Sequence, residues 1–423
     1  MSNNSSSHLF NQLGDAIEQR WLAANYNEQE FPAIARGALE EFDLPSKTNP
    51  WEALEWALSV RELPRQMDLY GRFAQPPVTL YLAPRFHVDV YFWFTSTTTL
   101  HQHNFCGAFQ VFEGSSLHSW YEFDLEQHVN IFTEIGKLDL KVCQVLEKGM
   151  TQEIWPGRPY IHSLFHLDEP SMTIVVRTHR SPVAAPQYNY FKPGLALDPF
   201  FEDETGIKKL QLVRTLLQAR RPDADGLIAN LLKESDLQTS YNILSNLRAA
   251  LKGDVMEQAF GLSSSLQRFE GFLALVEERH GEFGNILRPI FHHMDLQDHL
   301  VSRRHVVTKP DERFFLALLM NLDTRDQVLD LLRTRYSDQD PVEKVLDWIL
   351  DLSETRIMGQ QGNPIGIDMG AVDMLALEGI LRGKGDDEIA REYCAESGKD
   401  DAAPVTDALE KLRGCLTLRP LLA

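Results

Sequence analysis

Hydrophobic and polar residues alternate with two different periods along the chain, and each change of period marks a boundary. Near the start, apolar residues recur at every fourth position, at Leu9, Leu13, Ile17 and Trp21. This spacing places them on one face of a helix. Two further short helices are expected over 33–42 and 49–60. Residues 1–74 are therefore predicted to form an N-terminal helical segment.

From residue 78 to residue 178 the chain consists of short runs of β-branched and aromatic residues. Gly, Pro, Asn or Asp separates one run from the next. The pattern predicts eight or nine short strands. So many short strands favour a sandwich or a small closed barrel over a parallel sheet with crossover helices. We assign this β domain to residues 75–180.

A Pro-rich stretch over 181–205 is predicted to be a linker. Beyond it, amphipathic helical periodicity returns and continues to the end of the chain, which predicts a large all-α domain over 206–423. A Gly-rich interruption at 358–370 is interpreted as a surface loop. The fold class expected from these patterns is α+β and multidomain.

The composition is that of a globular protein, with 43% hydrophobic and 24% charged residues. The formal net charge of −20 opposes binding to nucleic acid or to an anionic membrane, so neither is an expected partner. No apolar run approaches the length of a membrane span, and no secretory signal opens the chain. The four cysteines include no CxxC pair. We expect a cytoplasmic protein.

Candidate metal ligands occur in the β domain. His101 and His103 are two positions apart, so on a strand both side chains point to the same face, where two imidazoles can converge on a metal ion. A Trp-Pro-Gly turn at 155–157 precedes a further strand that carries His162. His166 lies four residues beyond, about 13 Å along a strand, and is interpreted as a packing residue rather than a ligand.

These motifs resemble those of the cupin superfamily. The first cupin motif has HxH, then Glu four or five positions later, then Gly after six more residues. His101 and His103 match the HxH and Gly114 matches the closing glycine, but the Glu position holds Gly107, with Ala108 beside it.

The second cupin motif has a PxG-type turn before a His, with Asn four residues after that His. The turn at 155–157 and His162 match loosely, and His166 stands in the Asn position. The resemblance implies a double-stranded β-helix, or jelly-roll barrel, over residues 75–180. It covers about a quarter of the chain.

A cupin motif without the Glu is similar to the cysteine dioxygenase-like, or thiol dioxygenase, branch. That resemblance implies Fe²⁺ bound by His101, His103 and His162, although other divalent transition metals also accept three imidazoles. It further implies O₂ and a small carboxylate- or thiol-bearing substrate. An arginine anchors the substrate carboxylate in that family, and Arg85 and Arg177 are the candidates here.

Two alternatives stay open. In the first, the barrel is a non-catalytic ligand-sensing module, and the helical domain binds a partner protein or forms a homodimer. In the second, a metal is held elsewhere, by the helical stripe of His292, Asp295 and His299. A solvated helix face is the commoner explanation of such a stripe.

Overall fold

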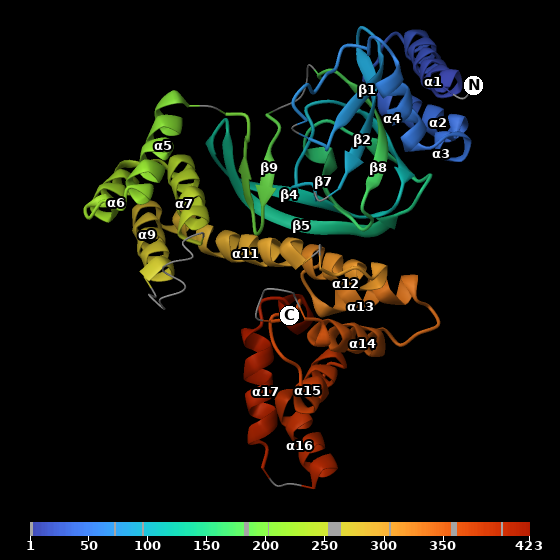
Figure 1. Ribbon diagram of the computed structural model, residues 1–423. Coiled ribbons are helices and arrows are strands. Elements are labelled where there is room, and N and C mark those ends of the chain that lie inside the picture. The colour runs from blue at the N-terminus through green and yellow to red at the C-terminus, as the bar shows by residue number, and fades with distance from the viewer. Residues whose placement is uncertain are drawn as a thin grey trace.

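The structure is a computed structural model of a mixed α/β protein with two five-stranded antiparallel sheets and many helices (Figure 1). It describes residues 3–71, 73–94, 97–181, 186–201, 203–252, 264–303, 306–356, 362–398 and 401–423. The inner faces of the two sheets share one hydrophobic cluster, to which Tyr91 and Val175 contribute from the first sheet and Leu146 and Leu164 from the second. The double-stranded β-helix topology remains a prediction from the motifs.

The N-terminal helices are α1 (Asn3–Ala23), α2 (Phe31–Phe42), α3 (Leu44–Lys47) and α4 (Pro50–Ser59). Helix α4 begins where Asn49 accepts a hydrogen bond from the Glu52 backbone amide, which satisfies one of the free donors of its first turn. The apolar stripe of α1, including Leu13 and Ile17, packs against the outer face of the first sheet in one cluster with Val88.

The first sheet has the order β1 (Pro77–Leu82), β2 (Phe86–Trp93), β8 (Ser171–Thr178), β3 (Gly107–Glu113) and β6 (Thr151–Ile154). Alternation along β2 explains its two faces. Val88 and Val90 pack under the N-terminal helices, whereas Tyr91 and Trp93 point between the sheets. All residues of β2 are buried because both faces are covered.

The second sheet has the order β7 (Ile161–His166), β4 (Ser116–Asn130), β5 (Thr133–Leu146), β10 (Leu195–Leu197) and β9 (Asn189–Phe191). The predicted linker at 181–205 therefore contains two strands, which corrects the linker assignment. Leu195 pairs with Ile135 of β5 and is fully buried. Strands of three residues are too short to show a period of two, and the surrounding prolines suggested a connector.

Thirteen helices follow among the described residues: α5 (Glu204–Gln218), α6 (Ala224–Glu234), α7 (Leu237–Lys252), α9 (Ser264–His280), α10 (Glu282–Asn285), α11 (Leu287–Arg303), α12 (Pro310–Asn321), α13 (Arg325–Arg335), α14 (Pro341–Glu354), α15 (Ala371–Leu381), α16 (Asp386–Ser397), α17 (Ala403–Gly414) and α18 (Arg419–Leu422). They form two hydrophobic clusters. One includes Ile135 and Leu195, and the other includes Leu117 and Phe165. Both clusters thus cover the outer face of the second sheet, beneath which α11 and α12 run (Figure 1).

No helix in the described part of the chain combines the length and the apolar character needed to cross a bilayer. The Gly-rich loop predicted at 358–370 lies partly outside the described residues, because 357–361 are not among them. Its remainder, residues 362–370, contains neither a helix nor a strand.

Candidate metal centre

Two segments of irregular backbone bring the candidate ligands together. His101 and His103 lie between β2 and β3, in isolated bridges rather than in a continuous strand. The His101 amide donates to the His162 carbonyl and the His162 amide donates to the His101 carbonyl, both over 3.0 Å. The Gly157 amide donates to the His103 carbonyl over 2.8 Å. The HxH segment and the turn before His162 are therefore joined directly through the backbone.

The three imidazoles converge inside the protein. Each offers one ring nitrogen, and these nitrogens all lie within 4.8 Å of one another. Nε2 of His103 is 2.9 Å from Nε2 of His162. Two nitrogens bound at right angles to one ion, each about 2.0–2.1 Å from it, are separated by roughly 3 Å. The spacing of this pair fits a shared metal ion.

The hydrogen bonds of His101 and His162 indicate which ring nitrogen of each is free to bind a metal. His101 Nδ1 lies 2.6 Å from the Thr99 carbonyl, which can only accept, so Nδ1 carries the proton and Nε2 carries a lone pair. That Nε2 is buried and has no hydrogen-bond partner among the described residues. His162 Nδ1 contacts His118 Nε2 at 3.2 Å. When His162 donates there, its Nε2 lone pair faces His103, a contact that a proton or a cation must stabilise.

The electrostatic environment keeps the three ligands neutral. Burial lowers the pKa of His101 to about 4. Burial also lowers the pKa of His103 and His162 well below the usual value, and neighbouring imidazoles add to this shift. Metal binding requires neutral imidazole rings, so at neutral pH no imidazolium has to be deprotonated first.

The backbone at Gly107 leaves no space for a side chain. A Cβ atom on Gly107 would lie 1.9 Å from the Val176 carbonyl oxygen, so the neighbouring strand β8 leaves no room for a side chain. The metal-binding group found among the described residues contains three histidines and no carboxylate. The adjacent Cys106 points away, to Thr178 and the Glu28 carbonyl, and burial raises the pKa of its thiol to about 11.

Two further residues contact the triad and escaped the sequence analysis. His118 of β4 lies behind His162, and the Tyr160 hydroxyl is 3.3 Å from His118 Nε2. Burial raises the pKa of Tyr160 well above its usual value, so its hydroxyl keeps its proton. Strand alternation places His118 on the same face as Trp120, and Trp120 pairs with His162. The pattern was visible in the sequence, but the pairing of β4 with β7 was not.

The two candidate arginines have different surroundings. Arg177 is half-buried in β8, and its guanidinium carbon lies 3.3 Å from the centre of the Phe105 ring. Its charge contributes to the lowered pKa of His103, and its Nε is buried without a partner among the described residues. Arg85 is exposed and lies over the Tyr26 ring, beside the N-terminal helices. Of these two, Arg177 shares the interior with the triad.

The remaining histidine candidates lie apart from the triad. His166 Nδ1 is 3.2 Å from the Ser171 hydroxyl, and its ring stacks on Trp93 at 4.7 Å. The stripe on α11 does not converge, since His292 is exposed and Asp295 pairs with Arg248. His299 Nε2 instead contacts the Pro364 carbonyl at 3.3 Å.

No family model matches the chain. No curated protein matches it either. Among solved structures, it is similar to DMSP lyases (20% identity, TM-score 0.17, covering 24% of this chain and 41% of the other). It is also similar to a recombinant oxalate oxidase in complex with glycolate (15%, 0.18, 33% and 64%) and to the capsular polysaccharide assembling protein CapF from Staphylococcus aureus (17%, 0.18, 28% and 32%).

The chain covers less than two thirds of each of these solved chains. TM-scores this low leave its fold and its activity to be judged from its own residues.

Proposed function

We propose that this protein is a metal-dependent enzyme of the cupin type, and more narrowly a mononuclear non-haem iron(II) oxygenase. Its substrate is a small molecule that carries a carboxylate or a thiol. The observation that carries the proposal is the buried group of His101, His103 and His162, whose ring nitrogens lie within 4.8 Å of one another. Buried imidazoles with lone pairs directed at one point are costly unless a cation or a proton compensates them.

The three histidines would hold the ion. An iron(II) ion bound there would supply the redox chemistry needed to activate O₂. His118 accepts the Nδ1 proton of His162 and so fixes the ring orientation, as supporting hydrogen bonds do at other metal sites. The Thr99 carbonyl does the same for His101.

Arg177 would bind the substrate carboxylate. Its position in β8 places a positive charge within electrostatic reach of His103. Its buried Nε, which has no hydrogen-bond partner among the described residues, would be available as a donor. Phe105, Phe109 and Trp93 belong to the apolar cluster between the sheets. They would exclude water from the reacting groups and strengthen the ion pair between Arg177 and the substrate.

The first test is the metal content of the protein, purified without a His tag, loaded anaerobically with iron(II) and desalted. We expect about one ion per chain, the content of a single site, and its loss in the His101→Ala/His103→Ala double variant. The His8→Ala variant, changed at an exposed residue of α1, should keep the metal. A folded wild-type protein that takes up no metal would overturn the proposal.

The oxygenase assignment needs a second measurement. Oxygen consumption by the iron-loaded protein is expected with small thiols or amino acids, and Arg177→Met should raise KM more than it lowers kcat for carboxylate substrates. Metal binding without oxygen consumption would leave a metal-dependent cupin of other chemistry.

The alternative function is a non-catalytic binding module. It is favoured by the two clusters through which the helices pack on the second sheet, since they connect the β domain to a large surface for a partner. A folded protein that binds no metal would favour this alternative.

A further inference from the structure

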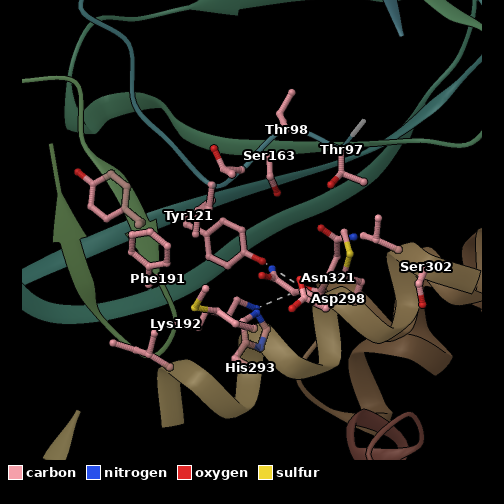
Figure 2. A pocket seen from close by; sticks show the side chains of 18 residues that line it. Thr97, Thr98, Tyr121, Ser163, Phe191, Lys192, His293, Asp298, Ser302 and Asn321 are labelled. Atoms are coloured by element: carbon pink, nitrogen blue, oxygen red, sulfur yellow. Dashed lines mark hydrogen bonds between the residues drawn. The ribbon is translucent and has the colours of Figure 1, made fainter. Parts of the chain in front are cut away.

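A cavity of about 430 Å³ lies on the other side of the second sheet from the triad. One of its walls is formed by residues 97–100 together with parts of β7 and β9, and the other by α11 and the end of α12. Figure 2 shows side chains from both walls pointing toward one another. A space of this size is within the range of small-molecule sites.

Much of the lining is apolar. Phe191 contributes an aromatic ring, and Ile290, Met294, Val301 and Met320 contribute aliphatic surface. The Tyr121 ring also lines the cavity, and its hydroxyl donates to the Asn321 carbonyl over 3.1 Å (Figure 2). Such a lining favours a ligand with a flat apolar body, because aromatic rings pack well against one another.

Three polar side chains of the lining are left without a side-chain hydrogen bond within the described part of the chain. Ser163, His293 and Gln297 make no side-chain hydrogen bond to any other residue that the structure describes. Ser163 is nevertheless 9% exposed, so its hydroxyl has little access to bulk water. Water or a ligand in the cavity can satisfy a polar group in this position.

The charges around the cavity are already paired. Lys192 Nζ lies 2.8 and 2.9 Å from the two carboxylate oxygens of Asp323. Asp298 accepts from Arg248 over 2.5 Å. Burial and the nearby Lys192 lower the pKa of His293 to about 4, so this ring is neutral at pH 7. A charged ligand would find no free counter-charge, so an uncharged ligand fits this lining best.

The cavity wall is joined to the metal centre. The Thr99 carbonyl, within the lining segment 97–100, accepts a hydrogen bond from His101 Nδ1 over 2.6 Å. Thr98 is fixed to β7 because its amide donates to the Leu164 carbonyl and its hydroxyl accepts from the Leu164 amide. Ser163 is the chain neighbour of His162, on the opposite face of β7. A molecule that moves this wall therefore moves two of the three candidate ligands.

We propose that the cavity is a second binding site, for an uncharged small molecule with a flat apolar body and amide- or hydroxyl-type hydrogen-bonding groups. Its occupation alters the metal affinity of the triad through Thr99 and β7. The binding stands by itself, whereas the coupling rests on the proposed function.

Benzamide is a suitable probe, with benzoate and benzylamine as its negatively and positively charged counterparts of similar size. We expect saturation-transfer NMR on the metal-free protein to detect benzamide binding, and both charged probes to bind at least about tenfold more weakly, since neither finds a free counter-charge. Absence of benzamide binding, or equal binding of the charged probes, would overturn the proposal.

Two variants locate the probe. Val301→Trp fills the cavity and should weaken benzamide binding at least about tenfold, whereas Ser163→Ala removes one hydrogen bond and should weaken it about fivefold. Leu227→Trp adds the same ring at an exposed position of α6 and should change nothing. Unchanged binding in a folded Val301→Trp protein would show that the probe binds elsewhere and contradict the assignment.

The coupling is measured as the apparent Kd for Co²⁺ with and without saturating benzamide. We expect a change of about fivefold, and by reciprocity the same factor for benzamide when the metal is saturating. Benzamide binding with an unchanged metal Kd would overturn the coupling. Failure of metal binding itself would instead count against the proposed function and leave the probe results standing.

Discussion

The two faces of β7 carry different chemistry. On the inner face, His162 lies among neutral imidazoles and aromatic rings, with lone pairs directed at one point. On the outer face, one residue later, Ser163 lines a cavity whose charges are paired and whose remaining groups are uncharged. A strand covered on both sides thus presents two sites one residue apart, the inner suited to a cation and the outer to a neutral molecule. Substituting His162 or Ser163 tests to which of the two sites each residue belongs.

The largest expected effect concerns the glycine that keeps carboxylates out of the inner site. Gly107→Ala should lower the free energy of unfolding by more than about 3 kcal/mol, because the new Cβ overlaps the Val176 carbonyl oxygen. Urea denaturation followed by circular dichroism measures this change. The control Gly226→Ala adds a methyl group at an open helical position and should stabilise by up to about 1 kcal/mol. A Gly107→Ala protein as stable as the wild type would contradict the close approach of β8.

Adjacent substitutions in β7 separate the two faces. His162→Ala should weaken metal binding by more than about 100-fold, since losing a ligand exceeds the effect of losing a supporting hydrogen bond. Ser163→Ala should leave the metal affinity within about twofold, because its side chain points away from the triad. Titration with Co²⁺ measures both. Equal losses in the two variants would mean that the Ser163 side chain belongs to the metal site.

The inner site also predicts a pH dependence of stability. Burial lowers the pKa of His118 to about 4, below the ordinary value near 6.5. Between these values the unfolded chain binds a proton that the folded chain does not, so stability is complete above pH 6.5 and falls as the pH drops toward 4. For one such group the loss between pH 7 and pH 5 is about 2 kcal/mol.

This loss is tested by urea unfolding of the metal-free protein at the two pH values. His118→Gln, which cannot titrate, should reduce the difference by that amount, whereas Gln replacing the exposed His8 should not. Identical pH dependence of the wild type and His118→Gln would show that His118 is not buried as a neutral ring.

The smallest effect concerns the support of His162. His118→Phe keeps a ring of similar shape but removes the acceptor for His162 Nδ1, and should weaken metal binding about tenfold. Tyr160→Phe removes a hydroxyl that contacts His118 but keeps the ring beside His162, and should have a smaller effect. The Co²⁺ affinities of the two variants are compared. A larger loss of affinity in Tyr160→Phe than in His118→Phe would contradict the assigned orientation of His118.

The sequence predicted those features that depend on the spacing of neighbouring residues. The HxH motif and the turn before His162 were recognisable because two-residue alternation and a Pro-Gly turn are short-range signals. The N-terminal helices likewise follow from the four-residue spacing that begins at Leu9.

The other features of the two sites depend on contacts between segments that are distant in the sequence. His118 lies next to the triad because of the register in which β4 pairs with β7. Arg177, unlike Arg85, faces the interior because it pairs with Gly107 in the sheet. The cavity has walls from segments as distant as Thr98, Phe191 and Val301, so no spacing in the sequence marks it. Strands β9 and β10 were missed because three residues do not display a period.

X-ray absorption at the iron edge of the iron(II)-loaded protein tests the central claim most directly. We expect scattering from three imidazole rings per iron, reduced to two in His101→Ala, with no carboxylate ligand from the protein. Iron bound without imidazole scattering, or with the same scattering in the variant, would contradict it.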